Sequence, residues 1–167
     1  MTRTLILLRH AKAAQHGRAG DASRELSGRG ERQARALGPL LAAEVGAIDV
    51  ALVSTAARAA STATLLREGV EVGERRDVPE IYQYAARGLL DLVRDTEGDP
   101  GVLLVVGHEP TISSLAAHLH DDRKDSLALQ VSLGVPTATA CVLDVPTTWS
   151  DLDARTAHLR ALVRPSA

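Results

Sequence analysis

Aromatic residues are scarce in this 167-residue sequence, which contains no phenylalanine, one tryptophan and two tyrosines. Leucine, valine, isoleucine and alanine must therefore fill the interior, and the hydrophobic fraction of 45% is large enough to supply a core. The formal net charge is only −2. Because nucleic-acid-binding proteins normally combine a basic surface with aromatic side chains that stack on bases, the composition argues against this class.

Cysteine and long apolar runs are also scarce. The single Cys141 excludes an internal disulfide and a metal site built from several cysteines, and its apolar neighbours predict a buried thiol. The apolar run at residues 5–8 is too short for a signal peptide, and no stretch approaches the ~20 apolar residues of a membrane span. We therefore expect a cytoplasmic protein without a membrane segment, and its length fits a single domain over residues 1–167.

Short apolar runs alternate with helical patterns along the chain. The runs predicted to be strands cover residues 4–8, 48–53, 70–78, 102–106, 137–145 and 156–163. The segments predicted to be helices cover residues 29–45, 56–68, 85–97 and 111–120. Such alternation is typical of an α/β fold, and continuous apolar strands fit burial on both faces of a sheet. We predict three layers, with a mostly parallel central sheet and helices on both faces.

Individual residues indicate how some of these elements begin or bend. Pro39 lies inside the first predicted helix, where the missing N–H should kink or split it. Ser54 or Thr55 is expected to cap the second helix. Pro110 is expected at the first position of the fourth helix. The small and polar residues at 13–24 predict a loop.

Basic residues follow three of the predicted strands. Arg9 and His10 end the first strand, Arg58 lies in the first turn of the helix after the second, and His108 follows the strand at 102–106. In parallel sheets the ligand crevice lies beyond the carboxyl ends of the strands. We therefore expect these side chains to share one crevice, although 98 positions separate His10 from His108.

Each of these side chains also has an ordinary structural explanation. An arginine at a helix N-terminus opposes the helix dipole, which a bound anion would relieve, but Arg58 could equally be a solvated surface residue. His10 could be a buried, hydrogen-bonded imidazole, and His108 a loop histidine bonded to the backbone. A metal site on the two histidines is disfavoured, because no further ligand follows at helical spacing and Arg9 would repel a cation.

Taken together, the motifs are far more specific than any one of them. They are Arg9-His10, Ser54-x-x-x-Arg58-Ala59-x-x-Thr62, Gly107-His108-x-Pro110 and Arg24-Glu25-Leu26-Ser27-x-x-Gly30. This set resembles the signatures of the histidine phosphatase superfamily, which implies a phosphoglycerate-mutase-like fold. Only 50 positions separate Arg58 from His108, which leaves little room for a capping insertion. The chain therefore looks most similar to the small SixA-type phosphohistidine phosphatases.

The resemblance implies a role for each matching residue. His10 would be the nucleophile and would become transiently phosphorylated. Arg9, Arg58 and His108 would hold the phosphoryl oxygens, and Arg24 would be an additional arginine of the phosphate pocket. The chemistry is consistent with these roles. Phosphoryl transfer requires that the nucleophile is aligned with the phosphorus atom and that the charge on the phosphoryl oxygens is stabilised. Planar guanidinium groups match the geometry of those oxygens. A neutral imidazole is a good nucleophile near pH 7. No metal or cofactor is expected.

Three further positions leave alternatives open. Glu80 matches the family position of the proton donor, but it could be an ordinary loop carboxylate. Ala11 replaces the glycine of the family's Arg-His-Gly signature, so the backbone there could lie farther from the phosphate. Lys12 follows and either adds positive potential at the mouth of the site or is simply solvated.

The predicted activity is removal of phosphate from phosphohistidine in a protein, because a small uncapped site would admit a protruding side chain. The alternative substrate is a small phosphorylated metabolite, for which Glu80 should be essential. A non-catalytic phosphate-binding module is less favoured, because both histidines and both signature arginines are present. A mutase is also less favoured, because it would need a pocket that retains the departing alcohol, and the short segment between Arg58 and His108 leaves little room for one. We expect a monomer that has neither a nucleic-acid nor a membrane partner.

Overall fold

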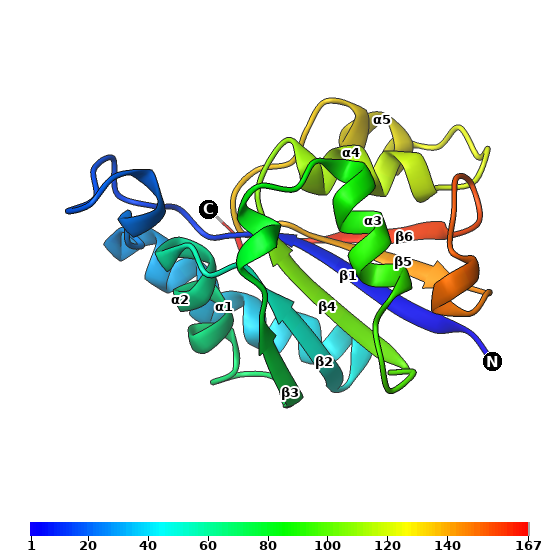
Figure 1. Cartoon of the computed structure of the whole chain (residues 1–167), viewed down its shortest axis with the longest axis horizontal. Helices are drawn as coiled ribbons and strands as arrows, with labels where there is room; N and C mark the ends of the chain where they lie inside the picture. The colour runs from blue at the N-terminus through cyan, green and yellow to red at the C-terminus, as the bar shows by residue number, and fades with distance from the viewer. Residues whose placement is uncertain (167) are drawn as a thin grey trace.

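The apolar runs of the sequence form one six-stranded sheet in the order β3-β2-β4-β1-β5-β6 (Figure 1). This computed structural model describes residues 1–166. The strands are β1 (Arg3–Arg9), β2 (Ile48–Val53), β3 (Val72–Asp77), β4 (Val102–Gly107), β5 (Ala140–Val145) and β6 (His158–Val163). Strands β3, β2, β4 and β1 pair in parallel, whereas β5 is antiparallel to both β1 and β6. The predicted mostly parallel sheet is therefore confirmed.

Helices cover both faces of the sheet, as predicted. The α-helices are α1 (Gly28–Val45), α2 (Ala57–Leu66), α3 (Ala86–Arg94), α4 (Thr111–Leu119) and α5 (Ser126–Ser132). Short 3₁₀ segments are η1 (Asp21–Ser23), η2 (Pro79–Tyr82) and η3 (Trp149–Asp151). Helices α1 and α2 pack on one face, and α3, α4 and α5 pack on the other (Figure 1). The sequence patterns did not predict α5 or the 3₁₀ segments.

Strand β1 lies in the middle of the sheet and supplies both cores. Leu5 and Leu7 join the core under α3, α4 and α5, whereas Ile6 and Leu8 join the core under α1 and α2. All four side chains are fully buried, as a continuous apolar strand covered on both faces should be. Cys141 is also buried, as predicted, and burial is the main reason that the pKa of its thiol is raised to about 12.

Pro39 lies inside the continuous helix α1, so it does not split the helix, and the expected kink stays a prediction. Two other local expectations were wrong. Neither Ser54 nor Thr55 caps α2: Ala56 is the N-cap residue, and no side chain accepts a hydrogen bond there as a cap. The Ser54 hydroxyl is instead hydrogen-bonded to a histidine of the candidate site. Pro110 is the N-cap of α4 rather than its first helical residue.

Within residues 1–166, every helix is either too short or too polar to cross a bilayer.

Candidate active site

The two histidines predicted to share a crevice lie next to each other at the carboxyl ends of β1 and β4. Parallel pairing places Arg9 opposite Gly107, and the backbone N–H of His10 donates to the carbonyl of Gly107 at 3.1 Å. The His10 and His108 ring centroids are 5.3 Å apart. The sheet register thus brings together two side chains that are distant in the sequence.

The His10 ring is held in one tautomer. Its Nδ1 atom lies 2.7 Å from the carbonyl oxygen of Ala11, which can only accept, so Nδ1 carries the proton. Nε2 is therefore unprotonated, and its lone pair accepts a hydrogen bond from Nε of Arg58 at 3.3 Å. Burial lowers the pKa of His10 to about 4, and the positive charges of Arg58 and Arg9 act in the same direction. The result is a neutral imidazole, as a nucleophile requires.

The backbone after His10 is fixed by a buried threonine of α2. Thr62 Oγ1 accepts from the N–H of Ala11 at 2.9 Å and donates to the carbonyl of Arg58 at 2.7 Å. The Ala11 methyl group, which replaces the family's glycine hydrogen, packs in a small apolar cluster with Leu26. The structure therefore accommodates alanine at this position, and it links the end of β1 directly to α2.

Arg58 lies in the first turn of α2, and its electrostatic conflict with the helix dipole is relieved by a carboxylate of the protein itself. Its side chain is only 8% exposed. Nη2 donates to Oδ2 of Asp21 at 2.9 Å, and Nη1 donates to the main-chain carbonyl of Asp21 at 2.8 Å. A buried arginine is expected to have such a partner. Arg58 thereby joins α2, η1 and His10.

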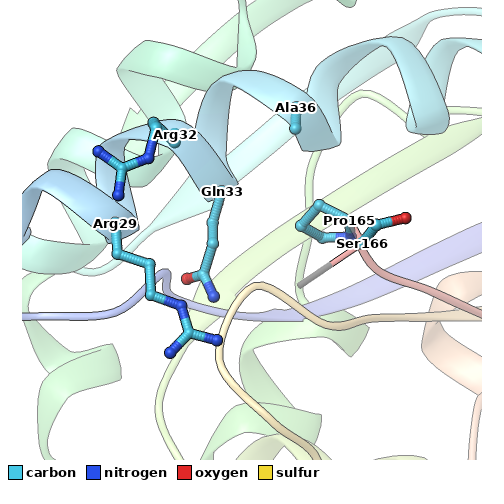
Figure 2. A pocket seen from close by; sticks show the side chains of 6 residues that line it. All are labelled: Arg29, Arg32, Gln33, Ala36, Pro165 and Ser166. Carbon is cyan, nitrogen blue, oxygen red and sulfur yellow. The ribbon is translucent and has the colours of Figure 1, made fainter.

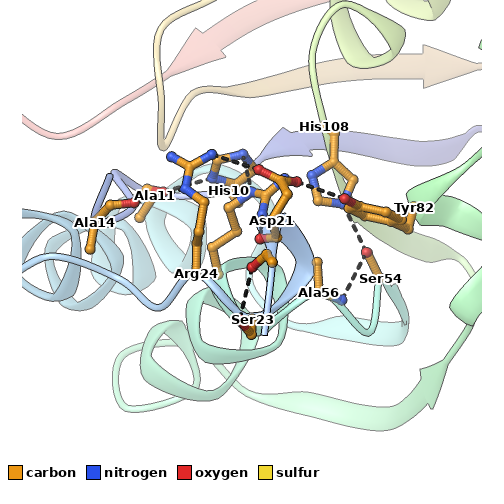
Figure 3. Close-up of polar contacts among 12 residues, drawn as sticks. His10, Ala11, Ala14, Asp21, Ser23, Arg24, Ser54, Ala56, Tyr82 and His108 are labelled. Atoms are coloured by element: carbon orange, nitrogen blue, oxygen red, sulfur yellow. Dashed lines mark hydrogen bonds and ion pairs between the residues drawn. The ribbon is translucent and has the colours of Figure 1, made fainter. Parts of the chain in front are cut away.

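Asp21 is the residue of this cluster that sequence reasoning missed. Its carboxylate also accepts from Nη1 of Arg24 at 2.8 Å and from the Tyr82 hydroxyl at 2.6 Å (Figure 3). Tyr82, Arg24 and Arg58, in that order, hold the pKa of the carboxyl group well below its usual range. The partners of Asp21 are Arg24 directly after η1, Tyr82 of η2 and Arg58 of α2, and Tyr82 is 61 positions away, so no local pattern could have identified that contact.

His108 is positioned by Ser54. Its Nε2 atom lies 2.8 Å from the Ser54 hydroxyl, and the Tyr82 ring packs nearly perpendicular to the imidazole, with the ring centroids 5.5 Å apart. Among residues 1–166, the buried Nδ1 of His108 has no hydrogen-bond partner. Burial, followed by the neighbouring His10 and Arg58, lowers the pKa of His108 to about 4. A second neutral imidazole with an available ring nitrogen therefore adjoins the first.

The other predicted residues divide into two groups. Arg9 donates from Nη1 to the Val135 carbonyl at 2.9 Å, and its buried Nε is unpaired within the described chain. Arg24 belongs to the cluster through Asp21. Lys12 and Glu80 are exposed, and within residues 1–166 neither side chain hydrogen-bonds to the cluster. The structure thus joins Arg24, Arg58 and both histidines through hydrogen bonds and contacts, and it places the charge of Arg9 near His10. Lys12 and Glu80 lie outside this network.

The gathered side chains suit an anion that has several oxygens. The positive charges of Arg58, Arg9 and Arg24 all act on the neutral His10 imidazole, whose Nε2 atom carries a lone pair. Guanidinium groups bind phosphoryl oxygens through paired hydrogen bonds. The cluster can therefore bind a phosphoryl group and present a nitrogen nucleophile to its phosphorus atom.

A separate group of potential metal ligands consists of His120, Asp121 and His158, whose ligand atoms lie within 4.8 Å of one another. Nδ1 of His120 accepts the backbone N–H of Leu159 at 3.0 Å, so the ring proton must be on Nε2. Neither nitrogen is then free to bind a metal. We interpret this group as a structural link between α4 and β6.

A cationic groove lies beside the first turns of α1 (Figure 2). Two adjoining hollows of about 430 and 450 Å³ form it, and both are lined by Arg29, with Arg32 in one and Arg164 in the other. In the part of the chain that the structure describes, none of these three arginines forms an ion pair. Gln33 lines both hollows and accepts the backbone N–H of Lys12 at 2.9 Å, so the groove borders the loop that follows His10.

Comparisons with known proteins agree with this geometry. The model of the histidine phosphatase superfamily (branch 1) matches residues 5–89. An uncharacterized protein of Mycobacterium tuberculosis is 34% identical over 148 residues, which are 87% of this chain and 92% of that protein.

Solved structures are similar over the whole chain. A Nakamurella multipartitia protein provisionally described as the phosphohistidine phosphatase SixA is 31% identical, with a TM-score of 0.86 over 100% of this chain and 98% of that one. A protein from Agrobacterium tumefaciens with the same description is 26% identical, with a TM-score of 0.77 over 98% and 99% of the two chains. A mycobacterial glucosyl-3-phosphoglycerate phosphatase shares the fold at 20% identity, with a TM-score of 0.65 over 96% and 98%.

Proposed function

This chain belongs to the histidine phosphatase superfamily, branch 1, and from that premise we propose that it removes phosphate from phosphohistidine in a protein through a phospho-His10 intermediate. The observation that carries the proposal is the state of His10: a neutral ring, protonated on Nδ1, with its Nε2 lone pair among the arginines. An imidazole in this state can attack phosphorus without first losing a proton.

In the proposed reaction, Nε2 of His10 attacks the phosphorus atom and forms a new N–P bond. The P–N bond of the substrate breaks, and its imidazole leaves with the bonding electron pair and takes a proton from solvent. The charge on the three equatorial oxygens is stabilised by the guanidinium groups of Arg9, Arg24 and Arg58 and by Nδ1 of His108. Water then attacks the phosphorus of phospho-His10, which releases inorganic phosphate and restores the neutral imidazole.

Two features support a protein phosphohistidine as the substrate. An imidazole leaving group needs less help from an acid than an alkoxide does, and Glu80 is exposed and outside the hydrogen-bond network of the cluster. The cationic groove of Arg29, Arg32 and Arg164 next to the His10 loop complements an acidic segment of a protein substrate.

A small phosphomonoester is the second candidate. Glu80 shares the short segment η2 with Tyr82, whose ring contacts His108, so the carboxylate lies close in the chain to a residue of the site. A modest movement of η2 would bring a proton donor toward a leaving alkoxide. The mechanism through His10 is the same for this substrate.

The proposal is tested by incubating the protein with a phosphohistidine protein and measuring released phosphate, with His10→Ala as the control. The wild type should release phosphate, and its own chain should acquire an acid-labile, base-stable phosphoryl label. The His10→Ala variant should show neither result. Equal phosphate release by both proteins would contradict the proposal.

A further inference from the structure

We propose that Asp21 is an internal competitor for the phosphoryl pocket, whose carboxylate occupies the arginines until a phosphoryl group displaces it. Asp21 would then determine how tightly the site holds substrate and product phosphate. This inference rests on the proposed function, because it assumes that the arginines around His10 bind phosphoryl oxygens.

The first evidence is the set of donors that Asp21 uses. Its carboxylate accepts from Arg24 at 2.8 Å and from the Tyr82 hydroxyl at 2.6 Å (Figure 3). It also accepts from Arg58 at 2.9 Å. These are short, charge-assisted contacts of the kind that a phosphoryl group would make. Two of the donors are the arginines proposed to bind that group. A phosphoryl group and the Asp21 carboxylate therefore compete for the same guanidinium groups.

The second evidence is the orientation of Arg58. Its Nε donates to Nε2 of His10, the atom whose lone pair must attack phosphorus. Both terminal nitrogens of the guanidinium donate to Asp21, one to its main-chain carbonyl and one to its carboxylate. A phosphorus atom can approach Nε2 only when Nε of Arg58 moves off the lone pair. Because Asp21 restrains the other end of the guanidinium, this movement requires the contacts with Asp21 to loosen.

The third evidence is that Asp21 can withdraw without disturbing the core. Segment η1 buries none of its residues, and in Figure 1 the chain around it projects beyond the helix layers. Gly20, which precedes it, has a φ of 95°, a backbone conformation that glycine adopts readily. Segments with few buried contacts open at low free-energy cost. Arg24 has a separate anchor, since its Nε donates to the Ala14 carbonyl at 2.8 Å, and it can stay when Asp21 leaves.

The test is calorimetric titration of the full-length protein with inorganic phosphate near neutral pH. Asp21→Asn keeps the shape of the side chain and removes its charge, so phosphate should bind about tenfold more tightly than to the wild type, as expected when a charged competitor is lost. Tyr82→Phe removes one donor to the carboxylate but keeps the ring against His108. It should bind phosphate about two- to threefold more tightly, because the carboxylate is held less firmly.

The matched control is Asp122→Asn, the same chemical change at a carboxylate that is 87% exposed and paired with Arg155. Its affinity for phosphate should equal that of the wild type. If Asp21 instead positions Arg58 for phosphate binding, both site variants should bind phosphate more weakly than the wild type. Weaker binding or an unchanged affinity would overturn the inference. Thermal unfolding of each variant establishes that it is folded.

The two proposals fail in different ways. If the proposed function is wrong, the wild type will neither bind phosphate in a His10-dependent manner nor release it from a phosphohistidine protein, and the inference about Asp21 fails with it. If only the inference is wrong, wild-type hydrolysis and phosphate binding will be intact, and Asp21→Asn will show equal or lower affinity.

Discussion

Nε of Arg58 lies 3.3 Å from Nε2 of His10, so an arginine proposed to hold the phosphoryl oxygens also binds the nucleophile's lone pair. The opposite ring nitrogen is held by the Ala11 carbonyl at 2.7 Å. With both nitrogens engaged, the imidazole cannot flip without losing two hydrogen bonds. The ring is thus oriented before substrate arrives, and the phosphorus atom must take the place of Arg58 Nε at the Nε2 lone pair.

The first prediction concerns protonation of the two site histidines. The pKa values of His10 and His108 are lowered to about 4, chiefly by burial, from an ordinary value near 6.5. Both rings should therefore stay neutral as pH falls through about 6.5, and the nucleophile should be lost only as pH approaches about 4. Ring-proton NMR titration, with the signals assigned from His10→Ala, measures this directly. A midpoint near 6.5 for His10 would refute the prediction.

The second prediction concerns the buried threonine that connects β1 to α2. Thr62→Val removes the acceptor of the Ala11 N–H and leaves that donor buried without a partner. The free energy of unfolding should fall by roughly 1–3 kcal/mol, and phosphate release should slow because the loop after His10 loses its anchor. Urea denaturation measures the change in stability.

Thr64→Val, at an exposed threonine of the same helix, is the matched control. It should change stability by no more than about 0.5 kcal/mol, as surface substitutions usually do. Equal losses at the two positions would mean that the Ala11 contact contributes nothing specific.

The third prediction distinguishes the two candidate substrates. Glu80→Gln removes an acid while preserving the shape of an exposed side chain. Hydrolysis of a phosphohistidine protein should be nearly unchanged, whereas hydrolysis of an alkyl phosphate should slow by about 10²-fold or more if Glu80 protonates the alkoxide. Initial rates on both substrates with the same enzyme preparation provide the comparison. A large loss on phosphohistidine would favour an acid-dependent phosphomonoesterase.

The fourth prediction concerns the cationic groove. Arg29→Glu with Arg32→Glu reverses its charge, so KM for a phosphohistidine protein with an acidic surface should rise about tenfold, with kcat unchanged. Turnover of a small aryl phosphate should not change, because it does not reach the groove. The matched control is Arg87→Glu on α3, which covers the opposite face of the sheet. A KM that rises equally for both substrates would contradict a docking role.

Local patterns were sufficient for most of the fold, whereas the proposed role of His10 came from the resemblance to the histidine phosphatase superfamily. The apolar run of β1 predicted a strand buried on both faces, because such a strand needs an uninterrupted hydrophobic sequence. Arg9 and His10 at its end, with Arg58 and His108 after two other strands, could be located because parallel strands have their carboxyl ends on one edge. Helix α5 was missed because its seven residues include only one that is buried.

The amino-acid sequence alone therefore specified the six strands, four of the helices and which basic side chains would meet, since these depend on periodicity and chain order. Tertiary packing alone determined that Asp21 lies on Arg24 and Arg58, that Ser54 orients His108 rather than capping α2, and which nitrogen of His10 is free. These contacts join loops from different parts of the chain. Such contacts depend on the exact placement of whole elements, and no local pattern encodes that placement.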